Sequence, residues 1–161
     1  MRFKYILPVF LLVLLAVQTV KAQSEIQVDI LNNFNFGKVA ISGWSGSVSI
    51  EVANGAFNRV ATGSVELKNL GNYSPATLKF YSPTKNFDVL QLVLPGEVTL
   101  TRQGGSQTRT IYNITAWPSP PYYSIKKGVT VYMGGTIQLA DYLTNPGGIY
   151  TGNLTFTVVY E

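Results

Sequence analysis

Apolar and polar residues alternate along most of the chain, which is the pattern of β-strands with one buried face. The alternation is clearest in Ile26–Ile30, in Val48–Val52 and in the final stretch Tyr150–Glu161. Further strands are expected at Gly63–Lys68, Ala76–Tyr81, Val89–Leu94, Glu97–Arg102, Gln107–Thr115, Gly128–Tyr132 and Thr136–Ala140. Beyond the N-terminal apolar stretch there is no period typical of an amphipathic helix. The sequence therefore predicts an all-β protein.

Short turn signals separate these strands. Asn54-Gly55 is the strongest short hairpin signal, and it follows an alternating strand directly. Pro95-Gly96 and Gly104-Gly105 predict two more turns, which would join the three strands between positions 89 and 115 into a meander. Strands of this length and spacing favour an Ig-like antiparallel β-sandwich of about eight to ten strands over a barrel.

The N-terminus has the pattern of a secretory signal peptide. Arg2 and Lys4 form a basic segment, Ile6–Val17 is an apolar stretch, and Val20-Lys21-Ala22 places small side chains where a signal peptidase cleaves. A transmembrane anchor is the alternative, but this stretch is shorter than the roughly 20 residues needed to cross a bilayer. We expect residues 1–22 to be a signal peptide and residues 23–161 to form one domain, in the periplasm, at the cell surface or outside the cell.

The composition narrows the function. The 161 residues include no Cys and no His, so the chain offers no thiolate or imidazole for catalysis, no haem or zinc ligand of those types and no disulfide. We therefore expect a non-enzymatic protein without a metal or cofactor. Three of the 12 basic residues lie in the predicted signal peptide, which leaves nine against eight acidic ones. A mature charge of about +1 gives no argument for nucleic acid or for anionic lipid.

The last strand carries the most specific pattern. Every second residue belongs to a series that is mostly apolar or aromatic, while most of the intervening residues carry hydroxyl groups. The series is Gly148, Tyr150, Gly152, Leu154, Phe156, Val158 and Tyr160. In one strand without a bulge, Leu154, Phe156 and Val158 would point into the core and Thr155 and Thr157 away from it.

The spacing of this series resembles the C-terminal signature of chaperone–usher (fimbrial) pilins and of spore coat U proteins. Phe34–Val39 looks like the turn that those families place after their first strand. Gly134–Ile137 followed by Gly148–Gly152 looks like the end of a secreted bacterial family of domains of unknown function. The resemblance implies a pilin-like sandwich whose last strand pairs with a periplasmic chaperone or another surface subunit by β-augmentation.

Two departures from the pilin pattern leave alternatives open. The Cys pair common in pilins is absent, and Ile26–Ile30 is too short to be a donor strand followed by a first strand. We expect Ile26, Val28 and Ile30 to be buried and paired within the same chain, because an exposed apolar edge would promote aggregation. The final strand is then an ordinary core strand or one wall of a groove that accepts a donor strand.

Aromatic residues supply the remaining candidate site. Trp117, Tyr122 and Tyr123 surround a proline-rich segment that cannot join a central strand, and Trp44 lies between glycines. These rings either cover one end of the core or lie exposed, where they could stack on sugars or form a protein contact.

We thus expect a secreted surface structural or adhesive protein of pilin-like type. The first alternative is a monomeric binding module for glycans or a host protein that uses these aromatics, and the second is a secreted hydrolase.

Overall fold

The computed structural model describes residues 26–69, 71–83, 89–123, 125–140 and 146–161, so the predicted signal peptide lies outside the described residues. The strands are β1 (Gln27–Asn32), β2 (Val39–Ala53), β3 (Ala56–Leu67), β4 (Ala76–Tyr81), β5 (Val89–Val93), β6 (Glu97–Arg102), β7 (Thr108–Trp117), β8 (Tyr122–Tyr123), β9 (Val129–Ala140), β10 (Tyr150–Thr151) and β11 (Thr157–Tyr160). A 3-10 turn, η1 (Ile125–Lys127), precedes β9. In this described part of the chain, no helix has the length and apolar character needed to span a membrane.

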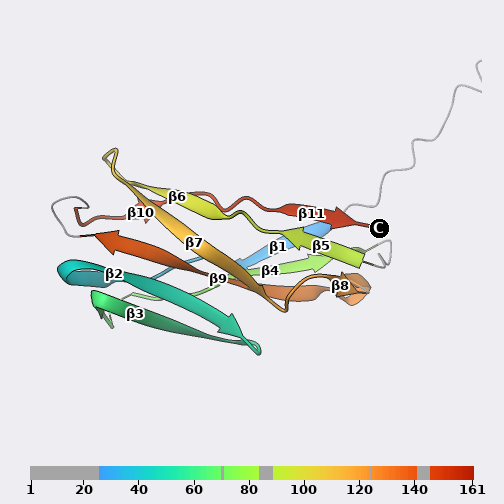
Figure 1. Cartoon of the computed structure of the whole chain (residues 1–161). Coiled ribbons are helices and arrows are strands. Elements are labelled where there is room, and N and C mark those ends of the chain that lie inside the picture. The colour runs from blue at the N-terminus through green and yellow to red at the C-terminus, as the bar shows by residue number, and fades with distance from the viewer. Residues whose placement is uncertain (1–25, 70, 84–88, 124, 141–145) are drawn as a thin grey trace, which may run out of the picture.

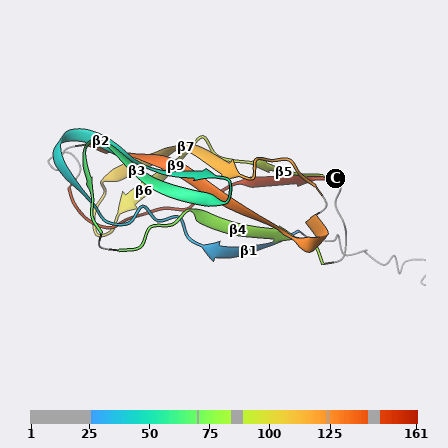
Figure 2. The ribbon, with the colours of Figure 1, turned by 90° about the horizontal axis from the view of Figure 1, so that it is seen from below.

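The strands form two antiparallel sheets. The larger sheet has the order β1-β4-β9-β7-β6-β10, with β2 also paired to β9 and β3 paired to β2 (Figure 1). The smaller sheet has the order β11-β5-β8. Seen from below, β1 and β4 lie on the opposite side of the molecule from β5 (Figure 2). The predicted all-β, antiparallel sandwich architecture is confirmed.

Strand β9 organises the larger sheet. Along one edge it pairs first with β4 and then with β2, and along its other edge it pairs with β7. The prediction of two separate strands, Gly128–Tyr132 and Thr136–Ala140, is wrong, because β9 runs continuously through Gly134 and Gly135. Their small size is used for packing: a methyl group at Gly134 would overlap the carbonyl oxygen of Ile50.

The predicted turns are correct in two of three places. Asn54 and Gly55 have positive φ values of 51° and 75° and connect β2 to β3, as an Asn-Gly hairpin requires. The hairpin of β6 and β7 around Gly104-Gly105 is also present. The predicted meander is wrong, because β5 pairs with β11 and β8 and not with β6. Pro95-Gly96 carries the chain from one sheet to the other.

The core has two parts. The first lies between the two sheets around Phe80, Leu90 and Met133, and the second lies against β2, β6, β7 and β9 around Val48 and Ile111. Phe34 and Leu154 pack against both parts. These two side chains therefore join the halves of the core.

The prediction of one continuous last strand is wrong. Tyr150–Thr151 pairs with β6 in the larger sheet, whereas Thr157–Tyr160 pairs with β5 in the smaller sheet. Residues 152–156 belong to neither strand, because they cross between the sheets. The predicted alternation is nevertheless confirmed: Leu154, Phe156, Val158 and Tyr160 are half-buried and pack against the core, while Thr155 and Thr157 are exposed.

The prediction for the first strand is correct in pairing and wrong in burial. Val28 and Ile30 pair with Phe80 and Leu78 of β4, so β1 is part of the sheet of its own chain. Ile26 packs against the core, but Val28 is 39% exposed and Ile30 is 70% exposed. The physical reason is that β1 is the end strand of the larger sheet, and the short smaller sheet does not extend over its inner face.

Candidate functional site

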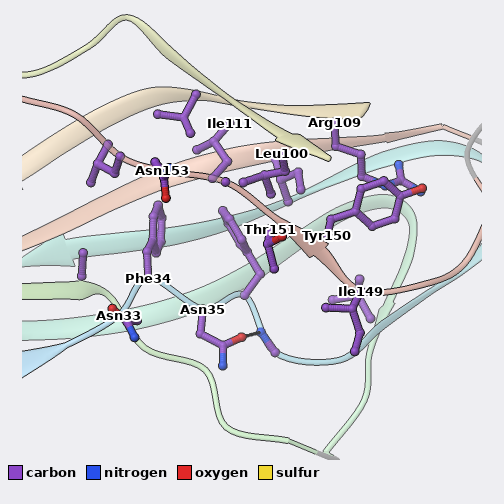
Figure 3. Close-up of a pocket in the computed structure, with 18 of the residues that line it drawn as sticks. Asn33, Phe34, Asn35, Leu100, Arg109, Ile111, Ile149, Tyr150, Thr151 and Asn153 are labelled. Carbon is purple, nitrogen blue, oxygen red and sulfur yellow. Dashed lines mark hydrogen bonds between the residues drawn. The ribbon is translucent and has the colours of Figure 1, made fainter. Parts of the chain in front are cut away.

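An open apolar groove lies between the inner face of the larger sheet and the C-terminal crossing segment. Its volume is about 1420 Å³. Apolar side chains from both ends and the middle of the chain line most of it. They include Val28, Ile30, Phe34, Phe36, Val39, Ile41, Leu78, Val98, Leu100, Ile111, Ile137, Leu139, Ile149, Leu154 and Phe156. Figure 3 shows Phe34 pointing into this space toward Asn153 and Ile111.

The C-terminal segment forms one wall and is anchored where it enters. Arg102 donates from Nε to the carbonyl oxygen of Gly147 at 3.0 Å, and the Tyr150 hydroxyl donates to the carbonyl oxygen of Pro146 at 2.7 Å. The guanidinium carbon of Arg109 lies 4.8 Å from the centre of the Tyr150 ring, which is cation–π geometry. These contacts fix the start of the segment against β6 and β7.

Two glycines of the C-terminal series have structural roles in this wall. A methyl group at Gly152 would overlap the carbonyl oxygen of Thr99 and crowd Leu100, so glycine allows the chain to approach β6 closely. Gly148 has a φ of 154° and lies against the Arg102 side chain. The series thus combines inward side chains with points of close backbone approach.

The segment after β1 forms the facing wall. The rings of Phe34 and Phe36 lie 4.8 Å apart between centroids. Asn35 exchanges two backbone hydrogen bonds with Ser74, at 2.8 and 2.9 Å, and its side-chain oxygen accepts from the Gly37 amide at 2.8 Å. The predicted turn motif is therefore a rigid support for one side of the groove.

The rim of the groove presents strand edges. Strand β1 ends the larger sheet, so one of its edges has no neighbouring strand among the described elements. Across the groove, residues 152–156 run between β10 and β11 outside either ladder. Unpaired backbone beside an apolar channel suits an added extended polypeptide, which can supply both hydrogen bonds and alternate apolar side chains.

The electrostatics of the groove do not suggest acid–base chemistry. Lys38 and Arg109 are the charged groups among the described lining residues, and no described lining residue carries a carboxylate. In the described ranges, no group of three acidic, histidine or cysteine residues could hold a metal ion. Apart from these two charged groups, most of the lining is suited to apolar contact.

The four candidate aromatics do not form one site. Tyr122 is buried, stacks on Phe80 and donates to the Pro118 carbonyl oxygen at 2.9 Å; burial raises its pKa to about 12. Tyr123 is exposed, Trp117 is half-buried, and Trp44 is 83% exposed.

Trp44 and Trp117 lie near opposite ends of β9. Ser45, next to Trp44, pairs with Ala140, whereas Trp117 pairs with Tyr132. Eight residues of extended strand separate these two β9 positions by about 26 Å. A shared stacking platform of the two tryptophans is therefore not formed.

The sequence predicted both walls and left a groove for a donor strand open as one alternative, but it did not identify the residues that line the rest of the groove. Phe34–Val39 and the C-terminal series were singled out, whereas Leu100, Ile111 and Ile137 look like ordinary core positions. One signal could have pointed to the groove: many strands have an apolar face, and the smaller sheet of three strands is too small to cover all of those faces.

Comparison with known proteins adds a family. A family model described as Domain of unknown function (DUF4402) matches residues 26–160. No curated protein and no solved structure matches the chain.

Proposed function

We propose, from the premise that the chain belongs to this family of domains of unknown function, that it is a secreted, non-enzymatic surface component of pilin-like type. In this role it assembles with a second copy of itself by strand addition at the groove. The single observation that carries the proposal is an apolar groove of about 1420 Å³ bordered by an exposed edge strand.

The occupant follows from the character of β1. Val28 and Ile30 point to the inner face of the sheet, yet Ile30 keeps most of its surface exposed. A second β1, laid antiparallel beside the first, would extend the larger sheet across both copies. Its own Val28 and Ile30 would then cover part of the groove and remove apolar surface from water.

The same arrangement solves a problem of solubility. A long apolar edge strand left open is a site of uncontrolled aggregation, and natural proteins cover or charge such edges. The exposed side chains of β1 include Val28, Ile30 and Leu31, with Asp29 as its one charged residue. Controlled pairing with a second copy provides the cover.

Oligomeric state tests the proposal. We expect the mature chain to associate as its concentration rises to about 100 µM. The association should persist from about 0.15 M to 1 M salt, because apolar contacts are not screened. Ile30→Lys should leave a monomer, since it places a charge on the rim.

Val93→Lys is the matched control. Val93 is 52% exposed on the outer side of β5 and does not line the groove, so its substitution should leave association unchanged. Analytical ultracentrifugation of the three proteins gives the answer. A monomeric wild type at every concentration, or equal disruption by both substitutions, would refute assembly through β1.

A second candidate function rests on Trp44. An 83% exposed tryptophan on a strand irregularity of β2 favours a monomeric binding module for a glycan or a host protein. A monomer whose tryptophan fluorescence changes with such a ligand, and does not change in Trp44→Phe, would support this candidate instead.

A further inference from the structure

A second, smaller depression lies on the outer face of the larger sheet. Its volume is about 210 Å³. The polar side chains around it come from three adjacent strands, β2, β7 and β9. They are Ser49, Glu51, Asn113, Thr115 and Thr136. We propose that this depression binds one unit of a neutral glycan chain, a function beyond the assembly proposed above.

The depression is created by a β-bulge. The register between β7 and β9 shifts between Tyr112 and Thr115, and Asn113 adopts a positive φ of 51° within that interval. Asparagine adopts this conformation more readily than most other non-glycine residues, so the bulge forms here and keeps an amide side chain at its tip. The bulge bends β7 and leaves the Asn113 side chain at the edge of the depression.

The hydrogen-bonding groups suit the hydroxyl groups of a sugar. The hydroxyl oxygens of Ser49 and Thr136 lie 2.9 Å apart and hydrogen-bond to each other, which positions both and leaves further bonding capacity on each. Glu51 offers acceptors, and the Asn113 amide offers both donors and an acceptor. A sugar hydroxyl also donates and accepts, so this mixed set matches it.

The charge of the depression selects against anions. Glu51 is the one charged side chain among its described lining residues, and no lysine or arginine is present there. A phosphate, sulfate or uronate group would be repelled by this carboxylate and would find no cation to pair with. The chemistry therefore favours a neutral polyol.

The surrounding face is suited to a chain of sugars and not only to a single one. Trp117 lies opposite Tyr132 on the same face, with ring centroids 6.2 Å apart. Tyr132 precedes Thr136 by four residues, or about 13 Å of strand. Trp117 and Tyr132 therefore lie farther along the same face of β9 as Thr136, and the faces of such rings are suited to sugar C–H groups.

Fluorescence titration of the full mature chain tests the proposal. Trp44→Phe leaves Trp117 as the remaining tryptophan, because the chain has two. The probes are cellohexaose, chitohexaose and mannohexaose as neutral chains, and hexagalacturonate as the anionic comparison. We expect a change in Trp117 emission with at least one neutral chain, at a Kd of about 1 mM or tighter, and none with the anionic chain.

The decisive variant is Asn113→Gly in this background. Glycine accepts the positive φ without strain, so the bulge is retained while the amide is removed. We expect about a tenfold weaker Kd with an unchanged urea midpoint. Asn54→Gly is the matched control, because Asn54 has the same φ of 51° but does not line the depression; its Kd should be unchanged.

Four outcomes would overturn the proposal. Three of them are no response to any neutral chain at several times the expected Kd of about 1 mM, equal weakening by Asn54→Gly and Asn113→Gly, and tighter binding of hexagalacturonate. Binding that EDTA abolishes would also overturn it, because it would assign the depression to a cation held by Glu51.

Discussion

Truncating Phe156 to Ala should destabilise the fold much more than the same change at the neighbouring Thr157. Phe156 is half-buried in the first part of the core, and its ring meets that of Phe80 edge-on at a centroid distance of 5.9 Å and an angle of 74°. Phe80 itself has no exposed surface. Thr157 points outward from β11 and is exposed.

The expected magnitude follows from these contacts. A fully buried phenylalanine costs about 3–5 kcal/mol of unfolding free energy when it is replaced by Ala. Phe156 also borders the open groove, so part of its surface is already in water, and we expect a loss of about 2–3 kcal/mol. The lost edge-on contact with Phe80 accounts for about 0.5–1.5 kcal/mol of that loss. Thr157→Ala should stay within about 0.5 kcal/mol of the wild type.

Urea denaturation of the two variants and the wild type measures the difference. The dependence of free energy on urea should keep its slope, so that the shift in midpoint reports stability. Phe80→Ala serves as the fully buried reference and should lose more than Phe156→Ala. If Thr157→Ala proved as damaging as Phe156→Ala, the alternation of side chains through the crossing segment would be wrong.

Three further predictions concern stability. Gly134→Ala should lose about 2 kcal/mol or more in urea denaturation, because its methyl group would overlap the Ile50 carbonyl oxygen, whereas Gly96→Ala, with no atom within 4 Å, should be near neutral; equal effects would contradict this packing. The stability gained by keeping Tyr122 protonated is complete below its ordinary pKa of about 10 and is lost as the pH rises toward its folded-state pKa of about 12. Urea midpoints between those pH values should therefore fall less steeply for Tyr122→Phe than for the wild type, and parallel curves would refute the role of burial. Trp44→Ala should change the thermal midpoint little, since this ring is mostly in solvent, and a large drop would show that it packs in the fold.

The local sequence pattern was sufficient to predict those strands that have one apolar face and one polar face. The predicted bounds Ala76–Tyr81 and Glu97–Arg102 coincide with β4 and β6, because alternation and turn residues are encoded within each segment. The turn at Asn54-Gly55 was predicted correctly for the same reason. In the described part, eleven strands replace the predicted eight to ten: β9 merges two predicted strands, the final strand divides, and β8 was not predicted.

Which strands pair with each other could not be predicted from the local sequence pattern. Whether β5 joins β6 or β11 depends on residues more than sixty positions later in the chain, and Gly134-Gly135 has the same local signature in a turn and in a close-packed strand. The groove could not be predicted for the same reason, because it depends on which strands the smaller sheet covers. Val28 and Ile30 have the pattern of buried residues, and only the limited reach of the smaller sheet leaves them exposed.

The crossing of residues 150–160 between the two sheets makes folding depend on a segment far from the strands that it joins. Strand β11 completes one sheet, β10 completes the other, and Leu154 joins the two parts of the core. A nascent chain that still lacks these residues can form the β2–β3 and β6–β7 hairpins, but it cannot close its core. Such a chain would remain loosely folded until this segment is available, because contacts between distant segments form late. Any protease that trims the final strand would therefore return the whole molecule to that open condition.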